Sequence, residues 1–107
     1  MIPIQALTDE EILQSIVASV ERQSRSVEIY LFGSRADRSH NAHSDFDICL
    51  KGDLTASQFD AIHEDLHKLN TLKMIDISMY RDLDSSFKRI IDRKGILLNG
   101  RTTPKPA

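Results

Sequence analysis

Residues 32–48 read FGSRADRSHNAHSDFDI, and this polar stretch joins two apolar runs of the chain. The run before it, VEIYLF at 27–32, is short, β-branched and aromatic, and ends at Gly33. The run after it, FDICLK at 46–51, has a similar character and ends at Gly52. Short apolar runs bounded by glycine and polar residues are typical of strands. The stretch therefore predicts two strands connected by a polar loop.

Two amphipathic helices are predicted, one before and one after these strands. TDEEILQSIVASVERQ begins with Thr8 and places Glu11 three residues later, which is the capping box that starts many helices. Its apolar residues recur at helical spacing and predict a helix over 9–24. TASQFDAIHEDLHKLN repeats both features and predicts a second helix over 56–69.

The last part of the chain adds shorter elements. KMIDISMY predicts a strand over 73–80, and the apolar spacing after it predicts a helix capped by Asp82 or Asp84. GILLN, at 95–99, predicts a short closing strand. Because strands and helices alternate, we expect an α/β or α+β fold with one small mixed sheet flanked by helices.

Composition limits the class of protein. With 107 residues, 40% of them apolar and 28% charged, the chain is expected to fold as one domain, which we place at 1–100, with a disordered tail over 101–107. A net charge of −2 provides no overall basic field, so direct binding of nucleic acid is not expected. The single cysteine, the absence of a signal-like start and the absence of a membrane-spanning apolar run predict a cytoplasmic protein without a membrane partner.

Three aspartates stand where a charge is costly. Side chains alternate across a strand, so Asp45 and Asp47 are expected on one face, opposite the apolar residues between and after them. Asp76 lies within an apolar strand pattern, where a carboxylate needs a partner, a metal or solvent. Neighbouring carboxylates are tolerated mainly where a cation neutralises them. If their strands are adjacent, these aspartates predict a site for two Mg²⁺ or Mn²⁺ ions, whereas solvated strand positions are the simpler alternative.

A phosphate site is predicted at the turn before the loop. Gly33 and Ser34 directly follow a strand, and backbone N–H groups with a serine hydroxyl can bind an anion there. Arg35 is a candidate for contacting phosphate, with an ordinary surface position as the equal alternative. Gly-Ser alone is usually a simple turn. Gly-Ser followed after ten residues by Asp-x-Asp arises by chance at about one position in 10⁵, so the joint pattern is informative.

On these residues the chain resembles the DNA polymerase beta-type nucleotidyltransferase superfamily. The resemblance rests on the Gly-Ser pair, the Asp-Phe-Asp-Ile motif and the isolated strand aspartate, and it extends over about residues 9–99. The short length is similar to that of the minimal nucleotidyltransferases, which occur with a helical HEPN-type or substrate-binding partner protein. The site residues that the resemblance implies are Gly33, Ser34 and Arg35 for the nucleotide, and Asp45, Asp47 and Asp76 as catalytic residues and metal ligands.

The resemblance also implies a reaction and a partner. A nucleoside monophosphate, AMP from ATP in the simplest case, would pass to a hydroxyl of the partner protein in the presence of Mg²⁺ or Mn²⁺. In toxin-antitoxin pairs of this superfamily, such a transfer can silence a HEPN toxin, so the resemblance implies an antitoxin role for this chain. The alternative is a catalytically weak nucleotide-binding subunit that acts by occluding a helical partner. In both cases a hetero-oligomer or a homodimer is expected, because a chain this short has no second lobe to complete a ligand pocket.

Two further features of the sequence bear on these predictions. Arg38 stands five residues after the motif glycine, where many relatives have a second glycine, and it predicts a strained or rerouted turn. His40 and His43 could bind a transition metal with Asp45, although a solvated pair explains them more simply. The letters HEDLH at 63–67 match the HExxH pattern of zinc metalloproteases, but no histidine follows them, so a solvated helix face is favoured.

Overall fold

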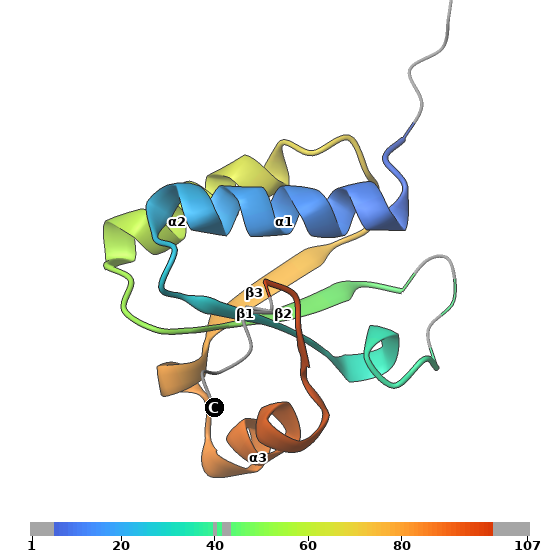
Figure 1. The fold of residues 1–107 in the computed structure, drawn as a ribbon. Coiled ribbons are helices and arrows are strands. Elements are labelled where there is room, and N and C mark those ends of the chain that lie inside the picture. The colour runs from blue at the N-terminus through green and yellow to red at the C-terminus, as the bar shows by residue number, and fades with distance from the viewer. Residues whose placement is uncertain (1–5, 40, 42–43, 100–107) are drawn as a thin grey trace, which may run out of the picture.

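A four-stranded sheet with helices on both faces forms the part of the chain that the structure, a computed structural model, describes: residues 6–39, 41 and 44–99 (Figure 1). The order along the chain is α1 (Asp9–Gln23), β1 (Glu28–Phe32), the 3₁₀ turn η1 (Gly33–Arg35), β2 (Phe46–Lys51), α2 (Ala56–His67), β3 (Ile75–Met79), the 3₁₀ turn η2 (Tyr80–Asp82), α3 (Ser85–Lys94) and β4 (Ile96–Leu97).

The sheet is mixed and has the strand order β3-β2-β1-β4. β1 pairs with β2 and with β4 in antiparallel fashion, whereas β2 and β3 are parallel and are joined through α2. The small mixed sheet flanked by helices that the sequence predicts is therefore confirmed. β2, which carries the Asp-x-Asp motif, lies between two strands, and β3 forms one edge of the sheet.

The first face of the sheet packs under α1 and α2, which lie side by side above it in Figure 1. Every second residue of β2 points into this layer, and Phe46, Ile48 and Leu50 are fully buried. The helices supply a matching stripe of apolar residues at helical spacing. The members of this core from the two helices are Ile12, Ile16, Val20, Ile62 and Leu66.

Local sequence signals set the helix boundaries. The Thr8 hydroxyl accepts a hydrogen bond from the Glu11 N–H while the Glu11 carboxylate accepts one from the Thr8 N–H, and Thr55 with Gln58 repeats this arrangement. Both capping boxes predicted from the sequence are confirmed. α2 ends at His67, two residues before the predicted limit, because the Leu69 N–H bonds to the Leu66 carbonyl in a tighter turn.

Of the elements that the structure describes, α3 lies against the second face of the sheet and covers part of it (Figure 1). Asp84, one of the two caps that the sequence allowed, accepts the Phe87 N–H and starts the helix. Ile91 is buried against the sheet, and the Asp92 carboxylate accepts a hydrogen bond from the Tyr80 hydroxyl at 3.0 Å. Cys49 lies beneath this layer, where burial raises the pKa of its thiol to about 11.

Some predictions concern parts of the chain outside the described residues, namely the tail at 101–107 and the loop residues His40 and His43. Across the described ranges, none of the helices combines the length and the apolar character that crossing a bilayer requires.

Candidate functional site

On the second face of the sheet, beside α3, three register partners from β1, β2 and β3 form a row. Asp47 on β2 stands opposite Phe32 on β1 and opposite Asp76 on β3 in the strand register. The strands of Asp47 and Asp76 are therefore neighbours, as the predicted two-ion site requires. Asp76 and Asp45, the residue that precedes β2, are exposed, while Asp47 is half-buried.

The three carboxylates act on one another electrostatically. The pKa of Asp47 is raised above its ordinary value, mainly by burial and then by the negative charges of Asp76 and Asp45. Burial and like charges both disfavour an ionised carboxylate. The fold therefore holds Asp47 in a place where a positive charge would stabilise it.

The donor set of this site suits a hard divalent cation. Carboxylate oxygens without thiolate or imidazole ligands are the choice of Mg²⁺ and Mn²⁺. Among the described residues, no three His, Cys, Asp or Glu side chains form a ready-made metal site. Asp45, Asp47 and Asp76 fit such an ion by the chemistry of their oxygen ligands, and Asp47 and Asp76 are partners in the strand register.

Gly33 brings the backbone against the Asp47 carboxylate. It has a φ of +77°, which glycine adopts readily, and a Cβ added there would collide with the Asp47 Oδ2 atom. Its carbonyl accepts the N–H groups of Ala36 and Asp37, which closes the η1 turn, and Ser34 lies half-buried within it. The Gly-Ser turn and the Asp-x-Asp strand, separated in sequence, are thus in contact in the fold.

Arg35 lies inside the protein instead of at its surface. Its side chain is only 4% exposed. The guanidinium donates to Asp9 and to the carbonyls of Asn41 and Ser44, and it stacks on the Phe46 ring at 4.0 Å from the centroid. The contacts observed for Arg35 are therefore with protein groups, and its predicted role as a nucleotide contact stays a prediction.

Asp9 and Lys73 are neighbours of this site that the sequence did not indicate. The Asp9 carboxylate forms ion pairs with the Lys73 ammonium at 2.5 Å and with the Arg35 guanidinium at 2.8 Å. Hydrogen bonds from Lys73 and then from Arg35 lower the pKa of Asp9. Asp9 is 26 residues from Arg35 and 64 residues from Lys73 in the sequence. No local pattern reports a contact over such separations, because capping and periodicity describe only one element at a time.

The loop after the turn is strained at Arg38, which has a φ of +65°. This left-handed conformation is unfavourable for residues that carry a Cβ. Of the two outcomes predicted for an arginine at a usual glycine position, the strained turn is the one observed. The chain therefore keeps the turn that glycine would favour and places an arginine in it.

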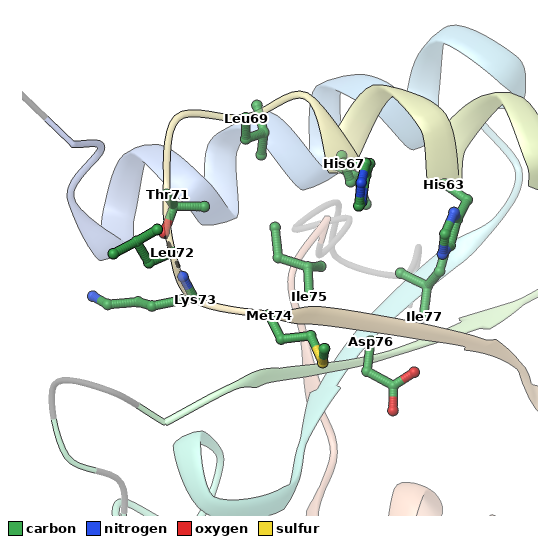
Figure 2. Close-up of a pocket in the computed structure, with 11 residues that line it drawn as sticks. His63, His67, Leu69, Thr71, Leu72, Lys73, Met74, Ile75, Asp76 and Ile77 are labelled. Atoms are coloured by element: carbon green, nitrogen blue, oxygen red, sulfur yellow. Dashed lines mark hydrogen bonds between the residues drawn. The ribbon is translucent and has the colours of Figure 1, made fainter. Parts of the chain in front are cut away.

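The histidine pair of the HEDLH segment lies away from the carboxylates. His63 and His67 are exposed on α2, with stacked rings 6.4 Å apart, and they line a groove of about 500 Å³ between α2 and β3. Figure 2 shows Asp76 projecting from β3 on the side opposite to His63 and His67. Asp76 also borders this groove, but its carboxylate points away from the two histidines, toward the other face of the sheet.

Comparison with solved structures identifies the fold. A chain of a toxin-antitoxin crystal structure with AMP-PNP has a TM-score of 0.64 at 19% identity, covering 80% of this chain and 71% of that one. A chain of the complex of tri-AMPylated Shewanella oneidensis HEPN toxin with MNT antitoxin has a TM-score of 0.64 at 17% identity, covering 89% and 75%. A chain of the MntA-HepT toxin-antitoxin structure has a TM-score of 0.62 at 17% identity, covering 88% and 74%.

Comparison with protein families is more specific. No curated protein matches the sequence. The family described as "Polymerase beta, Nucleotidyltransferase" matches residues 14–103, which include the turn at Gly33 and all three aspartates of the site. This match confirms the resemblance predicted from the Gly-Ser and Asp-x-Asp motifs. The chain belongs to the polymerase beta nucleotidyltransferase family.

Proposed function

We propose that this protein is a Mg²⁺-dependent nucleotidyltransferase that transfers AMP from ATP to a hydroxyl group of a helical, HEPN-type partner protein, and that it serves as the antitoxin of such a pair. The single observation that carries the proposal is the contact of the Gly33 turn with Asp47, in register with Asp76. This contact brings a turn suited to phosphate and a row of carboxylates suited to a cation onto the same open face.

In the proposed transfer of AMP, the turn, the carboxylates and the metal ions have different roles. The acceptor hydroxyl gives up its proton to solvent, and its oxygen forms a bond to the α-phosphorus of ATP. The bond from that phosphorus to the oxygen that bridges the α- and β-phosphates breaks, and pyrophosphate leaves. Gly33 and Ser34 would hold the triphosphate through the turn, and Asp45, Asp47 and Asp76 would hold the ions. Bound Mg²⁺ supplies neutralisation of the phosphates and a lowered pKa for the acceptor hydroxyl.

The proposed partner follows from the exposure of the site among the described residues. The carboxylate row lies on a face that α3 covers only in part, and Asp45 and Asp76 are exposed. Ligand pockets usually bury most of the ligand, so a second wall is needed. The neighbours with this fold are chains of toxin-antitoxin structures, one of which contains an AMPylated HEPN toxin. These observations support a HEPN-type partner over a homodimer. The domain bounds, residues 1–100, and the cytoplasmic location belong to the proposal as the sequence predicts them.

Transfer of label tests the proposal. The protein is incubated with Mg²⁺, α-labelled ATP and the product of the adjacent gene, and label is expected on that product, with none when Asp45→Asn and Asp47→Asn are combined. Label that persists in this double variant contradicts the assigned site. Tight binding of the partner without label transfer favours the alternative, a nucleotide-binding subunit that occludes its partner.

A further inference from the structure

A buried arginine ties the two ends of the loop between β1 and β2 together. The Arg35 Nε and Nη2 atoms both donate to the Ser44 carbonyl, at 3.1 and 3.0 Å, and Nη2 lies 3.4 Å from the Asn41 carbonyl. Arg35 itself directly follows the Gly-Ser turn, and Ser44 directly precedes Asp45. The same guanidinium therefore fixes the end of the turn and the start of the carboxylate motif.

The arginine reaches these groups from the core side of the sheet. Its guanidinium lies over the ring of Phe46, which is fully buried under α1, whereas Asp47 points to the opposite face. A group on this side can set the position of β2 without touching a ligand bound on the other side.

Asp9 extends the same network to the third carboxylate. One of its oxygens accepts from Arg35 and the other accepts from Lys73, which lies three residues before Asp76. Asp9, in the first turn of α1, is therefore linked both to the residues that precede β2 and to those that precede β3, and it fixes the starts of the two strands relative to each other. Arg35 is 4% exposed and Lys73 24% exposed in their side chains, whereas the Asp9 side chain that pairs with both is 42% exposed. Solvent therefore reaches this network mainly from the Asp9 side.

We propose that Asp9, Arg35 and Lys73 form a positioning clamp that fixes, relative to one another, the backbone segments that carry Asp45, Asp47 and Asp76, so that the three carboxylates can reach the same divalent ions. The inference rests on the proposed function, since it assigns the clamp to the same site. The three residues are positioning residues: they act through the backbone of β2 and β3 and not on the nucleotide. Groups that orient metal ligands typically change metal affinity by about 10–100-fold when they are removed.

The competing role for Arg35 is a direct contact with phosphate. That role would require the guanidinium to leave Asp9 and the Ser44 carbonyl, and a buried charge that loses its partners is strongly destabilising. Asp9 separates the two roles because it contacts Arg35 but has no part in phosphate binding. If Arg35 is part of a clamp, removal of the Asp9 charge weakens metal binding. If Arg35 binds phosphate directly, the same change releases the guanidinium for the nucleotide and does not weaken binding.

The experiment measures binding of Mn²⁺ by electron paramagnetic resonance in the full-length protein saturated with AMP-PNP, so that no turnover is involved. The variants are Asp9→Asn, Arg35→Lys and, as a milder change in case the first two fold poorly, Lys73→Gln. Glu10→Gln is the matched control, since Glu10 also lies in the acidic first turn of α1. Thermal unfolding of each variant reports whether it is folded.

Asp9→Asn is expected to weaken Mn²⁺ binding by roughly tenfold or more, Lys73→Gln by less, and Glu10→Gln not at all. Arg35→Lys keeps the charge but loses the forked geometry, so it is expected to behave like Asp9→Asn. Unchanged Mn²⁺ binding in folded Asp9→Asn and Lys73→Gln overturns the clamp. A wild-type protein that binds Mn²⁺ but transfers no AMP contradicts the proposed transferase and leaves the clamp standing. A wild-type protein that binds no Mn²⁺ overturns both.

Discussion

The two faces of the sheet use the same strands for different purposes. Toward α1 and α2, Ile48 and its alternate neighbours on β2 are fully buried among apolar side chains. On the opposite face, Asp47 carries a carboxylate whose pKa is raised by burial and by two other aspartates. Alternation of side chains along a strand allows both arrangements one residue apart. The first face stabilises the fold, while the second holds charges that the fold alone does not favour.

Asp47→Asn is the change expected to have the largest effect, and it concerns the second face alone. Under the proposed function Asp47 holds a metal ion, and loss of such a carboxylate removes several kcal/mol of transition-state stabilisation, so AMP transfer should fall by about a thousandfold. Thermal stability should stay the same or rise, because a buried like charge is removed. Transfer assays and thermal unfolding of the same preparation measure the two effects. A variant that loses activity because it unfolds would contradict the division between the faces.

Ile48→Ala, one residue further along β2, changes the first face of the sheet and leaves the second face intact. Ile48 is fully buried, and deletion of a buried isoleucine side chain to alanine usually costs about 2–5 kcal/mol. Chemical denaturation should show a loss of about 3 kcal/mol, while the activity of each folded molecule remains close to wild type. A thousandfold loss of activity in folded Ile48→Ala protein would show that the two faces are coupled more tightly than their packing indicates.

A pair of glycine variants compares the site with a distant turn. Gly33 and Gly52 both have positive φ values, of 77° and 147°, so alanine at either position should cost about 1–2 kcal/mol of stability. Only at Gly33 does the new Cβ meet the Asp47 carboxylate. Gly33→Ala should therefore also lower transfer by roughly a hundredfold, while Gly52→Ala, the matched control, should not. Equal activities for the two variants would remove the turn from the site.

Titration of two aspartates gives a finer comparison. The pKa of Asp47 is raised, so its ionised form weakens the fold at neutral pH, and this penalty disappears as the pH falls through its folded pKa. The pKa of Asp9 is lowered by Lys73 and Arg35, so its stabilising effect is present above the unfolded pKa and is lost as the pH falls through the folded one. Carboxyl NMR titration should place the pKa of Asp47 above that of Asp9. Asp76→Asn should lower the pKa of Asp47 and leave that of Asp9 unchanged.

How much the sequence could predict depends on how far each interaction reaches along the chain. The helices and strands were predictable because capping and periodicity are local, and the Gly-Ser and Asp-x-Asp motifs located the candidate site in advance. The contact of Asp9 with Lys73 was not, since 64 residues separate them and neither residue carries a local signal. Arg35 was ambiguous for the same reason: its burial depends on Asp9 and on the carbonyls of Asn41 and Ser44, which only the folded loop brings together.

Arg38→Gly is expected to have the smallest effect, and it acts on the loop that links the turn to the carboxylate strand. Arg38 adopts a φ of 65°, which costs a residue with a Cβ about 1 kcal/mol, partly offset by the greater freedom of glycine in the unfolded chain. Denaturation should therefore show a gain of at most about 1 kcal/mol. Arg38→Ala removes the same side chain but keeps the strained backbone, so it should show no gain. If both variants stabilise the protein equally, the arginine side chain is the cause, and the backbone conformation is not.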